Sequence, residues 1–195
     1  MSALRALQIV EFHDGRHAAA PDSGLWRAIE DNHRCNRQLW DEEDLARRRD
    51  VPDAEIAANK RAIDGYNQQR NDAIERIDEE LLSSLSQVKI KPDARLNSET
   101  PGAMIDRLSI LSLKIHHMRL QTLRTDVASA HIENCLLKLN RLNEQRTDLA
   151  ACFERLLDEA ARGEARFKVY RQFKMYNDPA LNPAIYGESK RSTRS

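Results

Sequence analysis

The sequence PGAMIDRLSILSLKIHHMRLQTL, residues 101–123, is the most informative stretch of the chain. On a helix its apolar residues cover nearly every side, most densely in LSILSLKI (108–115). A helix that is apolar all round is buried by other helices instead of packing on a single face. Ser98 or Thr100 can supply an N-cap oxygen and Pro101 fits a first helical turn, so we expect the helix to begin there. The stretch therefore predicts the central helix of a bundle.

Amphipathic patterns before and after this stretch predict further helices. Three of them are long, at about residues 25–49, 53–85 and 126–163. Pro52 separates the first two, Asp126 can cap the third, and Gly163 suits the turn after it. A short helix is expected at residues 4–12. The predicted fold is all-α: a bundle of four long helices, a short N-terminal helix and a basic-aromatic C-terminal segment.

Size and composition agree with one soluble domain. The chain has 195 residues, of which 41% are hydrophobic and 32% charged, with a formal net charge of zero. We expect a single domain over residues 1–186 and a disordered tail over residues 187–195. The zero net charge disfavours nucleic acid as a partner. No stretch approaches a membrane span, and three scattered cysteines without a CxxC pair favour a cytoplasmic location.

A polar motif occurs twice within apolar stripes. NQQRND (67–72) and NEQRTD (143–148) share the skeleton N-x-Q-R-x-D, and each places an Asn and an Arg where helical spacing predicts an apolar residue. Similar polar interruptions occur in the other two long helices, at His33, Asn36 and Glu43 and at Asp106 and His117. If the helices pack as a bundle, these interruptions meet at a common level.

Two interpretations of these polar residues remain open. A buried Asn can fix helix register, and an Arg can pair with a carboxylate to specify packing. Alternatively, the residues form a polar pocket that a ligand phosphate or carboxylate completes. Because an unpaired buried guanidinium is very costly, both arginines need anions. The candidate protein anions are Glu43, Asp44, Asp72, Asp106 and Asp148.

The C-terminal segment RFKVYRQFKMYND (166–178) alternates cations with aromatic residues. Cations grip phosphate while rings stack on a base or a pyranose, so the segment suits a phosphorylated sugar or a nucleotide. The alternative is a segment that docks its rings on the bundle and leaves its charges in water. Its periodicity is compatible with a short helix or with an extended chain.

Other chemistries find weaker support. A Mg²⁺ site would use the carboxylates of Glu43, Glu75 and Asp78, but carboxylates at such spacing are common on solvated helices. His117 and Asp106 are candidates for acid–base catalysis, since a carboxylate beside an imidazole fixes its tautomer. No P-loop, dinucleotide-binding motif or nucleophile elbow is present, so no cofactor is assigned.

Four stretches carry a resemblance to a known family: NHRCNRQLWDEEDLAR (32–47), KRAIDGYNQQRNDAIERID (60–78), LNSETPGAMIDRLSILSLKIHHM (96–118) and VYRQFKMYNDPALNP (169–183). They resemble the bacterial domain of unknown function 4254, over roughly residues 25–186. The stretch at residues 101–114 is also similar to a family associated with surface-polysaccharide genes. The resemblance implies a cytosolic bacterial protein encoded among genes for lipopolysaccharide or related envelope glycans, with no established activity.

We therefore expect a protein of envelope-glycan biosynthesis that binds a phosphorylated or nucleotide-linked sugar between its helices. The alternatives are a non-catalytic scaffold that docks on a glycosyltransferase or associates with itself, and a Mg²⁺-dependent nucleotide pyrophosphohydrolase. The candidate catalytic residues are Asp106 and His117. The candidate ligand-binding residues are His33, Asn36, Glu43, Asp44, Asp64, Asn67, Arg70, Asn71, Lys114, Tyr170, Arg171, Lys174, Tyr176 and Asn177.

Overall fold

The computed structural model describes residues 4–16, 23–173, 178 and 180–183. These residues form helices with one short pair of strands, which confirms the predicted all-α fold. In chain order the elements are α1 (Ala6–His13), α2 (Gly24–Leu45), α3 (Asp53–Ser84), β1 (Arg95–Leu96), α4 (Pro101–Thr122), α5 (Ser129–Ala161) and β2 (Ala165–Arg166). None of these helices is both long enough and apolar enough to cross a membrane. The predicted domain end at residue 186 stays a prediction, because it lies outside the described residues.

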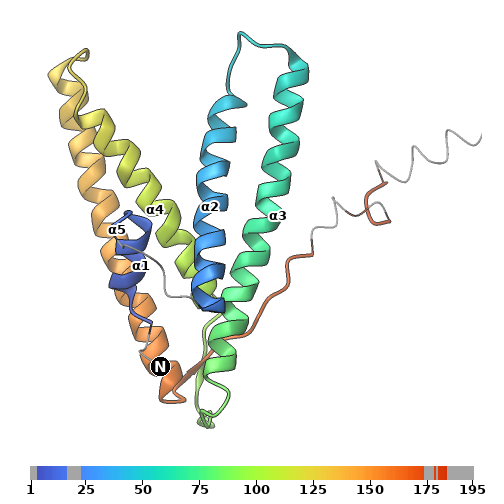
Figure 1. Cartoon of the computed structure of the whole chain (residues 1–195). Helices are drawn as coiled ribbons and strands as arrows, with labels where there is room; N and C mark the ends of the chain where they lie inside the picture. The colour runs from blue at the N-terminus through green and yellow to red at the C-terminus, as the bar shows by residue number, and fades with distance from the viewer. Residues whose placement is uncertain (1–3, 17–22, 174–177, 179, 184–195) are drawn as a thin grey trace, which may run out of the picture.

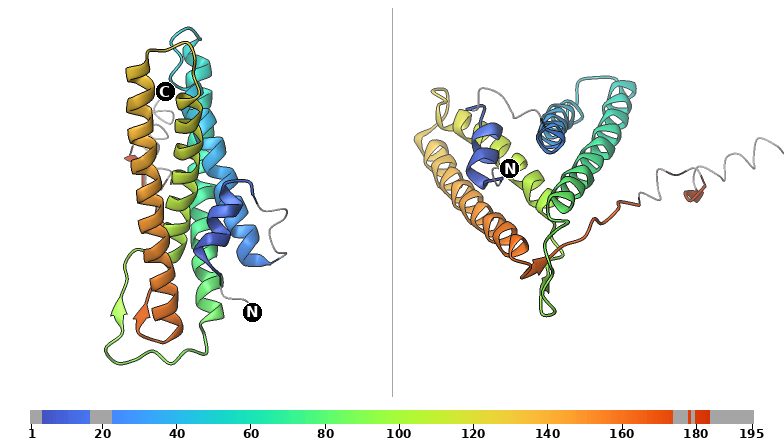
Figure 2. Two further views of the ribbon diagram at one scale, coloured as in Figure 1. Left: turned by 90° about the vertical axis from the view of Figure 1, so that its left-hand side faces the viewer. Right: turned by 60° about the horizontal axis from the view of Figure 1, so that its bottom comes forward.

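The two helical hairpins form a V (Figure 1). The antiparallel pairs α2/α3 and α4/α5 meet at one end and diverge toward the other, and the view from the side of α5 shows their length (Figure 2). Helix α1 lies against α4 and α5. The expected bundle is therefore closed at the vertex of the V and open between its arms.

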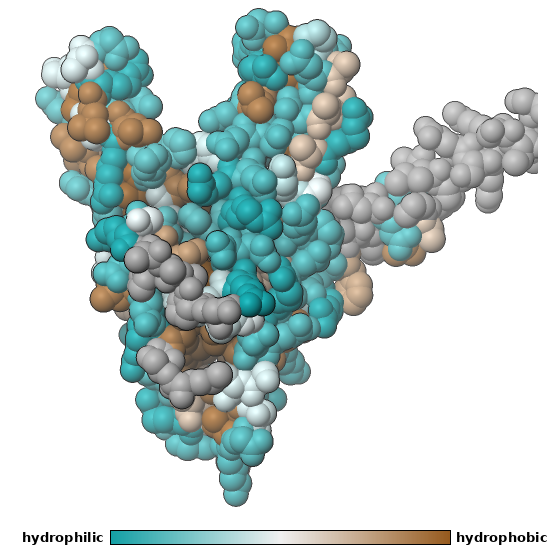
Figure 3. Space-filling view, viewed as in Figure 1, coloured by the Kyte–Doolittle hydropathy of each residue, from teal (hydrophilic) through white to brown (hydrophobic). Residues whose placement is uncertain are grey.

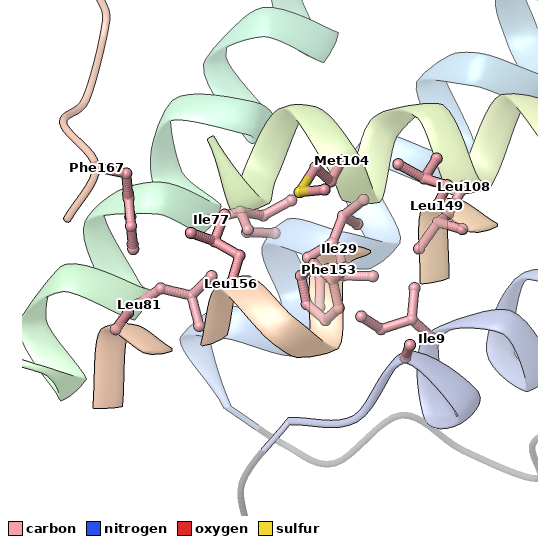
Figure 4. Close-up of a cluster of buried hydrophobic side chains, with 14 of the residues drawn as sticks. Ile9, Ile29, Ile77, Leu81, Met104, Leu108, Leu149, Phe153, Leu156 and Phe167 are labelled. Atoms are coloured by element: carbon pink, nitrogen blue, oxygen red, sulfur yellow. The ribbon is translucent and has the colours of Figure 1, made fainter. Parts of the chain in front are cut away.

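The apolar core fills the vertex (Figure 4). Ile77, Met104 and Phe153 bring α3, α4 and α5 together there, and Ile9 and Ile29 add α1 and α2. Burying each such side chain stabilises the fold by about 1.5–3 kcal/mol. Helix α4 contacts all four other helices, as its apolar circumference predicts.

Several predicted helix ends are confirmed. The hydroxyl of Thr100 accepts a hydrogen bond from the amide of Ala103, and Gly163 takes a positive φ of 69° after α5. The cap predicted at Asp126 is wrong. Helix α5 begins at Ser129, and the Asp126 carboxylate instead accepts a hydrogen bond from Arg124 at 2.7 Å.

The repeated N-x-Q-R-x-D motif occupies equivalent positions in two similar hairpins. Helices α2 and α4 each have 22 residues, while α3 and α5 have 32 and 33. Arg70 and Arg146 are each the eighteenth residue of their helix.

Eight residues after each arginine, an acidic side chain holds the N-terminus of another helix. Asp78 accepts a hydrogen bond from the amide of Gly102 in α4 at 2.7 Å. Glu154 accepts one from the amide of Ala6 in α1 at 2.6 Å. Carboxylates at helix N-termini are stabilised by unpaired amides and by the helix dipole. Each copy of the motif therefore belongs to a long helix that docks the start of a neighbouring one.

The chain after α5 is extended, not helical, up to residue 173. Strand β2 pairs with β1 in parallel, and the ring of Phe167 enters the core. Beyond it, Arg171 donates a hydrogen bond to Glu75 at 2.7 Å and another to Glu79, which fixes this segment on α3.

The contact between α3 and α4 gives a stability prediction. A Cβ added at Gly102 would lie 2.5 Å from the carbonyl oxygen of Ile74, so we expect Gly102→Ala to destabilise the fold by about 1–3 kcal/mol. Gly65→Ala is the control, because no atom lies within 4 Å of its added Cβ and alanine favours the helix by about 0.5–1 kcal/mol. Urea denaturation measures both variants. Equal stabilities for the two would contradict the close approach.

Candidate ligand-binding site

A buried polar network joins α2 to α4 just above the apolar core. The amide nitrogens of Asn32 and Asn36 donate to one oxygen of Asp106, at 2.8 and 2.9 Å. Asn36 lies 3.0 Å from the hydroxyl of Ser109, and Nδ1 of His33 lies 2.8 Å from the same hydroxyl. Because each of these buried groups has a partner, the network fixes the register of the two helices.

Arg70 of α3 lies beside this network but forms no hydrogen bond with Asp106. Its Nε is 3.9 Å from Asp106, beyond hydrogen-bond distance, and that nitrogen is buried with no hydrogen-bond partner. The side chain as a whole is 28% exposed, so part of it reaches the surface. An unpaired buried donor costs about 1–3 kcal/mol, so Arg70 is prepared to bind an acceptor.

Arg70 lines an open cleft of about 340 Å³ between α2, α3 and α4. Its lining combines carboxylates, amides, cations and one indole. The lining residues are Asn36, Leu39, Trp40, Glu43, Asp44, Arg47, Asn67, Arg70, Ile110 and Leu113. Of the predicted ligand-binding residues, the cleft thus brings together Asn36, Glu43, Asp44, Asn67 and Arg70.

In the second copy of the motif, Arg146 has a carboxylate partner. Nη1 of Arg146 lies 2.8 and 3.0 Å from the two carboxylate oxygens of Asp14, and both side chains are nearly buried. Asp14 follows α1, so α1 supplies the anion. The anions expected from the sequence for Arg146 were wrong, because the docking of α1 on α5 was not anticipated. Arg146 is therefore a structural residue, whereas Arg70 keeps donors for a ligand.

A second hollow, of about 570 Å³, adjoins the cleft and shares Trp40 and Asp44 with it. Lys114 and His117 line this hollow, and the His117 ring stacks on the Trp40 indole at 4.2 Å and 7°. Burial, together with the neighbouring His116, lowers the pKa of His117. Asp106 lies eleven residues away along the same helix, about 16 Å at 1.5 Å per residue, so the two candidate catalytic residues are not brought together.

His33 borders the network on the side that faces α1. Its ring stacks on that of His13 at 4.7 Å, and both border a hollow of about 580 Å³ beside α1. Burial lowers the pKa of His33 to about 4. Burial, with His33 and Arg146 nearby, places the pKa of His13 well below its usual value. Both rings are therefore neutral near pH 7.

The remaining predicted residues lie away from the cleft. Asp64 pairs with Lys60 on the surface of α3, and Asn71 is half-buried on α3 outside the cleft lining. Tyr170 and Arg171 belong to the segment that lies on α3, where Arg171 is held by Glu75 and Glu79. The last three candidates lie outside the described residues: Lys174, Tyr176 and Asn177.

The carboxylates considered for Mg²⁺ are engaged elsewhere. Glu75 accepts hydrogen bonds from Arg171 and from the amide of Gln172, while Glu43 pairs with Arg47 at 3.0 Å. Asp78 caps α4, and burial raises its pKa to about 6. Within the described ranges, no group of three or more His, Cys, Asp or Glu side chains is placed to hold a metal ion.

Sequence reasoning missed three residues of the site. Asn32 and Ser109 complete the network, and Trp40 forms the wall between the two hollows. Asn32 lies four residues before Asn36 on the same helix face, a spacing that predicts its burial. Ser109 carried no such signal, because serine is common in tightly packed helices.

The fold and cleft define a class: an all-α protein of two hairpins, with a polar site of ligand size between them. Residues 26–169 match the family described as protein of unknown function (DUF4254), and the chain belongs to this family. Neither the curated proteins nor the solved structures gave a match to the chain. The resemblance inferred from the sequence is thus confirmed for the family.

The two arginines give a stability prediction. Arg146→Met removes the nearly buried cation of Asp14 and leaves it only the exposed Arg16, at 2.7 Å, so we expect a loss of up to about 3–5 kcal/mol. Arg70→Met leaves Asp106 with its two asparagine donors, so we expect a change below about 1 kcal/mol, or a slight gain. Chemical denaturation measures both. A greater loss for Arg70→Met than for Arg146→Met would show that Arg70 is the structural residue.

The stacked histidines predict acid sensitivity. Their folded-state pKa values lie below the unfolded value of about 6.5, so stability is complete above that pH and falls as pH drops toward 4. Each histidine contributes a limiting slope of about 1.4 kcal/mol per pH unit. The raised pKa of Asp78 acts in the opposite direction between about pH 4 and 6, so variants must isolate the histidine effect.

Urea denaturation between pH 7 and 5 tests this prediction. His13→Leu is expected to flatten the pH dependence, because it removes a buried ring with two unpartnered nitrogens. His131→Gln, at an exposed histidine, is expected to keep the wild-type slope. Identical slopes in all three proteins would rule out the histidine pair as the cause.

Proposed function

We propose that this protein binds a phosphorylated or nucleotide-linked sugar in the cleft between α2, α3 and α4. The observation that carries the proposal is Arg70, whose Nε is buried without a partner at the edge of an open polar cleft. Its counterpart Arg146 is saturated by Asp14 in an equivalent position. The difference between the two arginines supports a ligand role for Arg70.

The other cleft residues suit a hydroxylated anionic ligand. Arg70 and Arg47 can bind phosphate oxygens with charge-assisted hydrogen bonds. Asn67 and the carboxylate of Asp44 can bind sugar hydroxyls, while Glu43 is paired with Arg47 at the edge of the cleft. A cleft of about 340 Å³ lies at the small end of ligand pockets, which fits one sugar unit. The adjoining hollow gives a larger nucleotide sugar room to extend.

The proposal is for binding and assigns no reaction. Asp106 is committed to Asn32 and Asn36, and the neutral His117 lies about 16 Å away along α4. The cytoplasmic setting and the association with lipopolysaccharide or other envelope glycans are proposed from the family resemblance described for the sequence. Such pathways use phosphorylated and nucleotide-linked sugars, so the proposed ligand and the proposed context agree.

A scaffold function is the competing proposal. The network of Asn32, Asn36, Asp106 and Ser109 is satisfied internally, as a device that fixes helix register must be. A scaffold for a glycosyltransferase requires no ligand in the cleft. Arg70→Met separates the two proposals: a ligand site loses binding and keeps its stability, whereas a scaffold loses stability or its partner.

Ligand titration tests the proposal. Glucose 1-phosphate, UDP-glucose and UDP-N-acetylglucosamine are added at millimolar concentration in thermal-shift assays, with glucose as the uncharged control, and any stabilising ligand is titrated by calorimetry. Loss of the Arg70 contacts is worth about 1.5–3 kcal/mol, so we expect roughly 10-fold to 100-fold weaker binding to Arg70→Met.

Arg171→Met is the matched control, since Arg171 lies in the extended segment that packs on α3 and does not line the cleft. It is expected to bind with wild-type affinity. Absence of a thermal shift with all three anionic ligands would count heavily against the proposal. Equal weakening by Arg70→Met and Arg171→Met would place the ligand elsewhere.

A further inference from the structure

We infer that the free end of the α4/α5 arm is an interface for a second copy of this chain. Four leucines there form an exposed group, the leucine patch, consisting of Leu120, Leu123, Leu136 and Leu137, with exposed fractions of 47, 74, 45 and 71%. Figure 3 shows apolar side chains gathered at the free end of this arm, at the upper left. Contiguous apolar surface on a charged protein marks an interaction site.

The arm is too thin to bury these leucines by itself. Between residues 116 and 148, all within the described chain, Cys135 is the sole buried residue. In that stretch α4 and α5 pack mainly on one another, with Trp40 of α2 reaching His117 and Asp14, after α1, reaching Arg146. Helices of a stable bundle, in contrast, bury apolar stripes against several neighbours along their length. The part of α5 from residue 129 to residue 148 is about 30 Å long at 1.5 Å per residue, which is sufficient for a paired interface.

Charge indicates which surface covers the patch. Residues 114–141, around the patch, contain five basic and two acidic residues. Residues 41–60, at the free end of the α2/α3 arm, contain seven acidic and four basic residues, beginning with the run DEED. The two ends are complementary, and within one molecule the diverging arms share only the hollow lined by Asp44 and Lys138. A second copy can bring an acidic end onto a basic one.

In a twofold dimer, the leucine patch of each copy is covered by the acidic end of the other copy. The α4/α5 arm of each copy lies against the α2/α3 arm of the other, so the same contact forms twice. The acidic end also offers Leu45, which is 39% exposed, as an apolar partner for the patch. Because the contact forms twice, each one needs to contribute about half of the roughly 1,200–2,000 Å² that a specific interface buries.

Light scattering coupled to size-exclusion chromatography tests the inference on the full chain at several protein concentrations. The wild type is expected to be dimeric, and Leu123→Asp and Leu137→Asp are each expected to weaken the dimer at least about 10-fold. Leu7→Asp is the matched control, since Leu7 is 64% exposed on α1, away from the patch. Circular dichroism checks that each variant keeps its helices, which exposed positions should allow.

A charge exchange identifies the partner surface. Lys138→Glu is expected to weaken the dimer, and Asp41→Lys in the same chain is expected to restore it by reversing the attraction. A monomeric wild type at every concentration would overturn the inference. So would equal effects of Leu7→Asp and the two patch variants. Weakening by Lys138→Glu without restoration by Asp41→Lys would overturn the pairing of unlike arms.

Discussion

The docking of α4 at the vertex is the constraint on which the rest of the structure depends. Its first turn meets α3 so closely that Gly102 faces the backbone of Ile74, and Asp78 accepts a hydrogen bond from the amide of Gly102. Apolar side chains then seal α4 against the other four helices. Because α4 belongs to one hairpin and is held by the other, this contact sets where the arms meet. It also sets the height at which Asp106 faces α2 and Arg70.

The positions of α1 and α4 give the two copies of the N-x-Q-R-x-D motif different surroundings. In the second copy, α1 brings Asp14 onto Arg146. In the first copy, α4 brings Asp106 close to Arg70, but two asparagines have already engaged the carboxylate. Arg70 is left with an unpaired donor beside an open cleft. The difference between the copies distinguishes a structural arginine from a candidate ligand contact without reference to any other protein.

Local patterns predicted the helices well, because capping and apolar spacing are encoded within a few residues. Thr100, Gly163 and the apolar circumference of α4 illustrate this. The polar residues at core spacing also predicted much of the cleft. The contact between Arg146 and Asp14 was beyond prediction, since it depends on how a short helix docks 132 residues away in sequence. The divergence of the arms was missed for a similar reason: amphipathic stripes show which face is buried, not what covers it.

A crystal structure of the protein with bound UDP-glucose tests the central claim most directly. If Arg70 is a ligand contact, a phosphate or hydroxyl oxygen of the ligand will lie within about 2.7–3.2 Å of the Arg70 guanidinium, with Asn32 and Asn36 still bonded to Asp106. A crystal in which Arg70 bonds Asp106 directly, the cleft is closed and the ligand lies elsewhere or is absent would contradict it.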